Sequence, residues 1–175
     1  MASTQLILLT GATGYIGGRL LKELESRGRH QRCLARQAQF LRPRVAGTTE
    51  IIQGDVLEPA SLKRALEGAQ TAYYLVHSMH GVSGFQEKDH EAARNFGQAV
   101  AAAGVRRIIY LSGLGDPTRP LSAHLRSRHE VVEVLRASGV PTLEFRADFR
   151  PQQCANVTPP EEPARATERL DIPAD

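Results

Sequence analysis

The chain has 175 residues, 41% hydrophobic and 23% charged, which is enough apolar material to bury the core of one globular α/β domain. The net charge of +3 comes from scattered basic residues with no Lys/Arg block and few aromatic residues, which argues against nucleic acid as a partner. The apolar run Leu6–Leu9 is too short for a membrane span or a signal peptide, so neither is predicted and the expected location is cytoplasmic. Cys33 and Cys154 are far apart in the sequence and indicate neither a disulfide framework nor a metal cluster.

The first expected element is a strand that breaks into closely spaced glycines and continues as a helix over residues 15–27. Gly11, Gly14 and Gly17 follow a G-x-x-G-x-x-G spacing. The first glycine permits a sharp turn, the second lets a ligand approach the backbone, and the third lets helix and strand pack closely. The free N–H groups and the dipole of the helix N-terminus favour a pyrophosphate, so this stretch predicts dinucleotide binding. An ordinary tight turn between a strand and a helix is the alternative.

A second strand is expected at residues 31–35 and ends at Arg36. In dinucleotide-binding folds, the residue that contacts the adenosine ribose lies at about this sequence distance from the glycines. An acidic residue there binds the ribose hydroxyls of NAD, whereas a cation meets the 2′-phosphate of NADP. Because no Asp or Glu lies near Arg36, the sequence favours NADP, with NAD still possible. A solvated arginine at a strand end is the alternative.

Strands and helices alternate through the rest of the chain as far as residue 146. A polar connection at 37–48 leads to a strand at 50–53, after which Asp55 is expected either to accept from the adenine amino group or to cap the next helix, and Val56 to cover the adenine ring. The other expected elements are a helix at 59–66, a strand at 71–76, a helix at 85–103, a strand at 107–112, a helix at 122–137 and a strand at 141–146. This rhythm predicts an α/β fold with one doubly wound parallel sheet and helices on both faces. His77 and His80 follow one strand without a third ligand nearby, so no metal site is predicted.

Five motifs in this order and spacing resemble the atypical short-chain dehydrogenase/reductase superfamily, in its NmrA-like, NAD(P)H-binding branch. They are Thr10–Gly17, Gly54–Val56, Asp89–Phe96, Gly104–Ser112 and Arg128–Glu133, and the similarity covers about residues 5–147. The resemblance implies a Rossmann-type fold and assigns the pyrophosphate to Gly11, Ala12, Thr13, Gly14, Tyr15 and Ile16. It further assigns the adenosine ribose or its phosphate to Arg36, the adenine to Asp55 and Val56, the region towards the nicotinamide to Val76 and His77, and a substrate-binding serine to Ser112.

The chain departs from the family where catalysis is expected. Active members carry a Tyr and, four residues later, a Lys, whereas the aligned positions here hold His124 and Arg128. Histidine exchanges protons near neutral pH and Arg128 keeps a positive charge, so a modified oxidoreductase remains conceivable. A guanidinium need not reach the nicotinamide ribose as an ammonium does. The alternative is that both are surface residues of an amphipathic helix.

The last residues differ in character from the rest. Residues 1–150 are expected to form the NAD(P)-binding domain, and residues 151–175 a tail that holds five of the ten prolines and few apolar residues. Such a tail is expected to stay disordered or to drape over the domain. A full-length family member continues beyond Arg146 into a substrate-binding part, so the chain looks truncated.

Two functional classes remain open. One is an NADP(H)-dependent oxidoreductase of a small carbonyl compound, or the cofactor domain of such an enzyme. The other is a non-catalytic NAD(P)-binding redox sensor or assembly factor. By analogy with similar proteins, the apolar faces of helices 85–103 and 122–137 are expected to pair in a homodimer.

Overall fold

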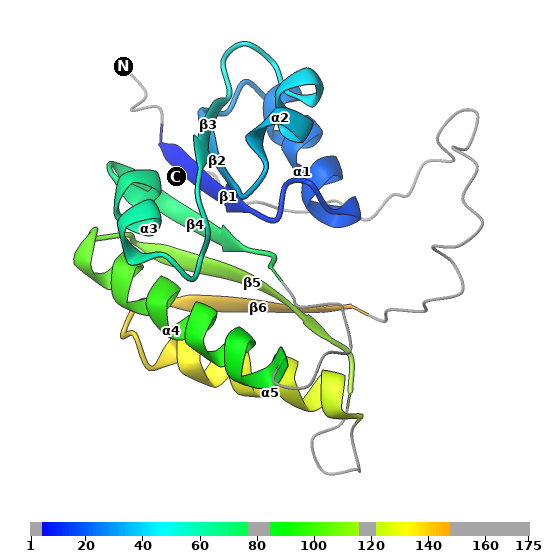
Figure 1. The fold of residues 1–175 in the computed structure, drawn as a ribbon, viewed down its shortest axis with the longest axis vertical. Coiled ribbons are helices and arrows are strands. Elements are labelled where there is room, and N and C mark those ends of the chain that lie inside the picture. The colour runs from blue at the N-terminus through cyan, green and yellow to red at the C-terminus, as the bar shows by residue number, and fades with distance from the viewer. Residues whose placement is uncertain (1–4, 77–84, 116–121, 148–175) are drawn as a thin grey trace, which may run out of the picture.

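Six strands form one parallel sheet in the computed structural model, which describes residues 5–76, 85–115 and 122–147 (Figure 1). The strands lie in the order β3-β2-β1-β4-β5-β6, and every neighbouring pair is parallel. Their bounds are β1 (Leu6–Thr10), β2 (Gln31–Ala35), β3 (Glu50–Gln53), β4 (Ala69–Tyr74), β5 (Arg107–Gly113) and β6 (Thr142–Ala147). The predicted α/β class and parallel sheet are confirmed.

Helices cover both faces of this sheet, as a doubly wound fold requires. One face carries α3, α4 and α5 over one hydrophobic cluster, and the other carries α1 and α2 over a second cluster. The helix bounds are α1 (Tyr15–Ser26), α2 (Ala38–Leu41), α3 (Pro59–Leu66), α4 (Phe85–Ala102) and α5 (Ala123–Arg136), with a 3-10 turn η1 (Arg42–Arg44) directly after α2.

The strand order reverses between β1 and β4. From β1 the chain moves outward to β3, returns to β4 on the other side of β1, and then moves outward to β6. In open α/β sheets, ligands bind in the crevice at the carboxyl ends of the strands where the order reverses. The fold therefore predicts a ligand site at the loops that follow β1 and β4.

The first core cluster contains three neighbouring aromatic rings that are tilted against one another. The ring of Tyr74 lies 4.8 Å from that of Phe96 on α4 and 6.1 Å from that of Tyr110 on β5, measured between centroids. The Tyr110 hydroxyl donates to the backbone oxygen of Arg128, 3.1 Å away, which ties α5 to the sheet. Burying each such ring contributes about 1.5–3 kcal/mol. Burial also raises the pKa of Tyr74 and of Tyr110, so both hydroxyls stay protonated at neutral pH.

The buried apolar residues of α4 and α5 belong to this core. Those of α4 are Ala92, Ala93, Phe96 and Val100, and those of α5 are Val131, Val132 and Leu135. The two helices also pack against each other within the chain (Figure 1). Because these side chains are already buried, a dimer through α4 and α5 would have to use their outer residues, and it stays a prediction.

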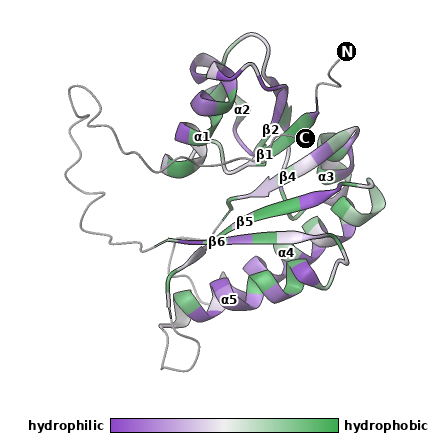
Figure 2. Ribbon diagram, turned by 180° about the vertical axis from the view of Figure 1, so that it is seen from behind, coloured by the Kyte–Doolittle hydropathy of each residue, from purple (hydrophilic) through white to green (hydrophobic). Residues whose placement is uncertain are grey.

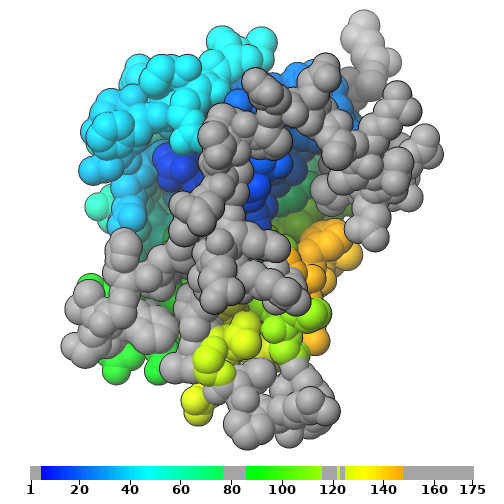
Figure 3. Space-filling view, turned by 90° about the vertical axis from the view of Figure 1, so that its right-hand side faces the viewer, coloured from blue at the N-terminus to red at the C-terminus, as the bar shows by residue number. Residues whose placement is uncertain are grey.

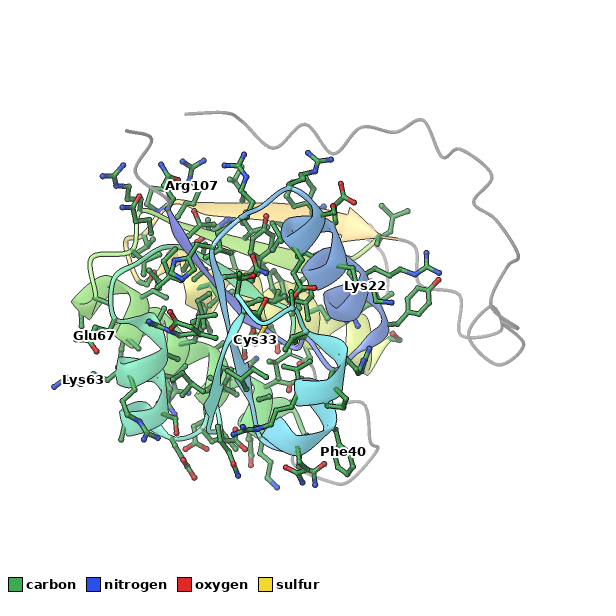
Figure 4. All side chains as sticks on the ribbon, turned by 90° about the horizontal axis from the view of Figure 1, so that it is seen from above. Lys22, Cys33, Phe40, Lys63, Glu67 and Arg107 are labelled. Carbon is green, nitrogen blue, oxygen red and sulfur yellow. The ribbon has the colours of Figure 1, made fainter. Side chains whose placement is uncertain are left out.

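Cys33 lies in the middle of β2 and is fully buried in the second cluster (Figure 4). Burial, assisted by the negative charge of Glu25, raises the pKa of the thiol to about 12. The thiol is therefore protonated at neutral pH and packs as a small apolar group. Cys154 lies outside the described residues.

Within the described ranges, no helix is long and apolar enough to cross a bilayer. The same part of the chain holds no group of three His, Cys, Asp or Glu side chains placed to bind a metal ion. His77 and His80 lie outside it.

Candidate functional site

The turn between β1 and α1 depends on two glycines for its own geometry. Gly11 has a φ of +75°, and a Cβ there would lie 2.6 Å from the backbone oxygen of Leu75. A Cβ on Gly17 would overlap the backbone oxygen of Gly11. Both positions must therefore be glycine for the turn to form and for α1 to pack against β1.

Gly14 is different, because the fold itself does not require a glycine there. Its φ of −78° and ψ of 172° are extended values that any residue adopts, and among the described residues a Cβ would meet only the Gly11 oxygen, at 3.3 Å. Gly14 is also exposed. A missing side chain at an exposed, unstrained position is what a ligand that approaches the backbone would need.

The first turn of α1 presents unpaired donors. Gly14 is the N-cap, no side chain caps the helix, and the first turn carries no acidic residue. The first intrahelical bond runs from the N–H of Gly18 to the oxygen of Gly14, so the N–H groups of Tyr15, Ile16 and Gly17 have no carbonyl partner within the helix. Three N–H groups and the positive end of the helix dipole form a site for an anion.

The position of this turn is fixed by a buried hydroxyl. Thr10 Oγ1 donates to the backbone oxygen of Tyr73 at 2.9 Å and accepts from the N–H of Leu75 at 3.2 Å. These two bonds join the carboxyl ends of β1 and β4 at the reversal of strand order. Because of these bonds, the glycine turn starts from a fixed position at the end of β1.

Cations lie beside the turn. Arg36 directly follows β2, is exposed, and continues the register in which Leu34 pairs with Thr10. Arg44 reaches back from η1, and its Nη1 lies 3.4 Å from the backbone oxygen of Thr13. Figure 3 shows residues of the 38–47 segment on the same side of the molecule as the start of the chain, with β6 on the opposite side. Two guanidinium groups therefore border the anion site.

Arg44 is a candidate that the sequence reasoning missed. Residues 37–48 were expected to be a polar connection, but α2 and η1 form there because Ala38 and Leu41 are buried in the second cluster and Val45 packs against it. The spacing of these three apolar residues was the sequence signal for this short helix and turn. The helix and turn place Arg44 next to the glycine turn.

The two predicted adenine residues lie after β3 at the same edge of the sheet. The Asp55 carboxylate accepts from the N–H of Leu57 at 3.0 Å, in a tight turn before α3. The N-cap of α3 is Glu58, so the alternative role of Asp55 as the cap of that helix is wrong. Val56 is buried in the first core cluster, which leaves little of its side chain to cover a ring. Adenine binding by these residues stays a prediction.

The residues predicted to lie nearest the nicotinamide and the substrate come from the carboxyl ends of β4 and β5 and from α5. Val76 is half-buried against the first cluster, while His77 and the side chain of His124 lie outside the described structure. Ser112 is fully buried; its hydroxyl helps to lower the pKa of Glu144 but meets no partner in hydrogen-bond geometry among the described residues. A substrate role for Ser112 stays a prediction.

Arg128 is buried rather than on the surface. Its residue is 7% exposed, and burial lowers the pKa of its guanidinium, opposed by the charges of Tyr110 and Asp89. Its Nη1 lies 3.9 Å from where a Cβ of Gly113 would be, under the carboxyl end of β5. The surface alternative is therefore wrong for Arg128. The guanidinium of Arg128 therefore lies inside the protein, next to the last residue of β5.

The glycine turn, the reversed strand order and the cations together define a Rossmann-type NAD(P)-binding domain. The profile of the NAD(P)H-binding family matches residues 11–142, and the chain belongs to this family. The predicted superfamily resemblance is thereby confirmed.

Similar proteins include reductases. The chain is 33% identical over 120 residues to cinnamoyl-CoA reductase 1 of Oryza sativa subsp. japonica, covering 63% of this chain and 35% of that protein. It is 33% identical over 137 residues to (4-alkanoyl-5-oxo-2,5-dihydrofuran-3-yl)methyl phosphate reductase of Streptomyces griseus, covering 78% and 45%. The chain thus spans less than half the length of these relatives.

Solved structures share the fold. A Rossmann-fold NAD(P)-binding family protein from Shigella flexneri superposes with a TM-score of 0.68 at 25% identity, covering 82% of this chain and 67% of that one. The triphenylmethane reductase of Citrobacter sp., solved with NADP(H), superposes with a TM-score of 0.73 at 19% identity, covering 87% and 52%. The second likeness supports the fold alone.

Proposed function

We propose that this chain binds NADP(H) at the β1–α1 turn and acts as the cofactor-binding part of an oxidoreductase. The observation that carries the proposal is Gly14, which is exposed and unstrained and is followed by three N–H groups that have no carbonyl partner within α1. This arrangement fits a pyrophosphate, because the N–H groups of a helix N-terminus bind anions and no described side chain lies against Gly14. When bound, the nicotinamide would supply or accept a hydride.

The preference for NADP(H) rests on charge. Arg36 and Arg44 border the turn, and their charges suit the 2′-phosphate that distinguishes NADP from NAD. Arg36 follows the strand next to β1, where the adenosine ribose is read in this type of fold. Arg44, which reaches back from η1 to Thr13, adds a second cation. NAD lacks the phosphate that both would bind.

An oxidoreductase role is supported by the reductase relatives and by the position of the remaining polar groups. Ser112 and Arg128 come from the carboxyl end of β5 and from α5, on the side of the sheet away from Arg36. Ser112 and His124 are proposed to face substrate, and Arg128 to hold β5 in place. The expected substrate is a small carbonyl compound. Because the chain covers less than half of its reductase relatives, we expect this part alone to reduce carbonyls weakly.

A non-catalytic role as an NAD(P)-binding redox sensor is the second candidate. It is favoured by the burial of Arg128, since a guanidinium held under Gly113 is poorly placed to reach a ribose as the usual lysine does. In that case the cofactor would bind with the same contacts and no turnover would follow.

Calorimetric titration with NADPH and NADH tests the proposal. NADPH should bind more tightly than NADH, and Arg36→Asp should reverse the order. Equal affinities that the substitution leaves unchanged would contradict NADP(H) selectivity. Oxidation of NADPH with a panel of aldehydes, ketones and quinones then separates the oxidoreductase from the sensor.

A further inference from the structure

Near its start, α1 contains a second buried glycine, Gly18, directly after Gly17. The close contact with Gly11 explains Gly17, but it does not explain Gly18. The N–H of Gly18 donates to the oxygen of Gly14 as in any helix, and its φ is not positive. Alanine is favoured over glycine inside a helix. A glycine at residue 18 therefore needs a reason outside the helix.

The side chain of Arg44 supplies that reason. A Cβ on Gly18 would lie 2.8 Å from Nη2 and 3.9 Å from Cζ of Arg44, so the guanidinium lies directly against the glycine. The other near atom is the backbone oxygen of Ala12, which would be 3.3 Å away, a tight contact that a small shift relieves. Alanine at residue 18 would thus displace the flexible end of Arg44 and leave the backbone almost unchanged.

The segment that carries Arg44 is anchored on both sides of η1. Leu41 before it is fully buried, and Val45 after it packs against the second cluster. The N–H of Ala46 donates to the carboxylate of Glu25 at 2.7 Å, which ties the segment to α1. Figure 2 shows α1 and α2 close together at the part of the sheet formed by β1 and β2, where both helices contribute to the second cluster. The backbone of Arg44 is therefore held in place without a ligand.

The guanidinium of Arg44 keeps donors for a ligand. Among the described residues, its hydrogen-bond partner is the backbone oxygen of Thr13, at 3.4 Å. A guanidinium has five N–H donors, and a neutral oxygen at this distance engages one of them weakly. Arg44 is exposed, whereas the glycine beneath it is buried. The contact with Thr13 thus orients the cation beside the glycine turn and leaves most of its donors available to an anion.

We propose that Gly18 determines part of the preference of this site for NADP(H). Its missing side chain lets Arg44 lie across the start of α1, where the guanidinium joins Arg36 in binding the 2′-phosphate. Gly18 acts through Arg44 and is a positioning residue. The inference rests on the proposed function, and it names a position inside a helix that sets the selectivity of the site. A side chain there removes a contact that NADP makes and NAD does not.

Calorimetric titration of the full chain with NADPH and with NADH tests this inference in a double-mutant cycle. Gly18→Ala should weaken NADPH binding about tenfold, as expected for the loss of one charge-assisted hydrogen bond, and should change NADH binding less than about twofold. In the Arg44→Ala background, Gly18→Ala should change NADPH binding less than about twofold, because the guanidinium is already absent. The unchanged NADH affinity shows that the variant is folded.

Gly47→Ala is the matched control, because no described atom lies within 4 Å of a Cβ there, and it should change the affinity for neither nucleotide. Three results would overturn this inference alone: Gly18→Ala binds NADPH as the unmodified chain does, it weakens NADPH and NADH equally, or it acts as strongly in the Arg44→Ala background. If the unmodified chain binds neither nucleotide, the proposed function itself is wrong, and the inference is wrong with it.

Discussion

Replacing Gly14 with alanine separates the needs of the ligand from the needs of the fold. Of the residues that the structure describes, the new Cβ meets only the Gly11 oxygen, at 3.3 Å, and the backbone has a conformation that alanine adopts readily. The gain of about 0.4–1 kcal/mol from a less flexible unfolded chain opposes the weaker N-capping by alanine. The free energy of unfolding should therefore change by less than about 1 kcal/mol, and Tm by less than about 4 °C.

Cofactor binding should respond far more strongly to the same substitution. A methyl group at residue 14 occupies the approach to the N–H groups of Tyr15 and Ile16. Losing one or two charge-assisted hydrogen bonds, at about 1.5–3 kcal/mol each, should weaken NADPH binding at least about tenfold. Calorimetry and a thermal melt on the same sample measure both effects.

Gly17→Ala is the matched control, because its Cβ overlaps the Gly11 oxygen. It should lower stability by about 1–3 kcal/mol through overpacking, whether or not cofactor is added. The reasoning would be refuted if Gly14→Ala bound NADPH as the unmodified chain does, or if it lost as much stability as Gly17→Ala.

Three other predictions follow from the site and its surroundings. Arg44→Ala should weaken NADPH binding more than NADH binding, whereas Arg42→Ala, on the same 3-10 turn, should change neither; equal effects of the two variants in a titration would exclude a specific role for Arg44. The chain alone should show little carbonyl reduction, and robust NADPH oxidation that disappears in His124→Ala would show this to be wrong. Burial would raise the pKa of Glu144, but the hydrogen bond and charge of Arg146 lower it overall, so its stabilisation is present above its ordinary pKa of 4.5 and is lost as pH falls through the lowered value. The Tm of the unmodified chain should therefore exceed that of Glu144→Gln at pH 7 and approach it in acid; a constant difference would contradict the ion pair.

The sequence predicted the framework well because its signals were local. The helix at 59–66 and the strands at 31–35 and 50–53 have the predicted bounds, since glycines, prolines and apolar runs mark their ends. β4 begins and ends two residues earlier than expected, at Ala69–Tyr74. Its register is set by pairing with β1, which a single stretch of sequence does not contain.

The site was predicted less completely because it depends on contacts between distant segments. The spacing of the three glycines predicted their role in the turn. It did not show that the fold itself requires only Gly11 and Gly17 of the three, because this depends on contacts with Leu75 and within the turn. Arg44 reaches Thr13 because α2 and η1 form in a segment whose polar sequence predicted only an irregular connection. The burial of Arg128 depends on packing beneath β5, whereas its helix pattern fitted a surface position equally well.

The central claim is that the N-terminus of α1 holds the pyrophosphate of a dinucleotide. Backbone amide NMR of the full chain during a titration with NADPH tests it most directly. The account predicts that the largest shift changes fall on the amides of Tyr15, Ile16 and Gly17 and saturate at one NADPH per chain. Saturable changes centred elsewhere, or no changes at millimolar NADPH, would contradict it.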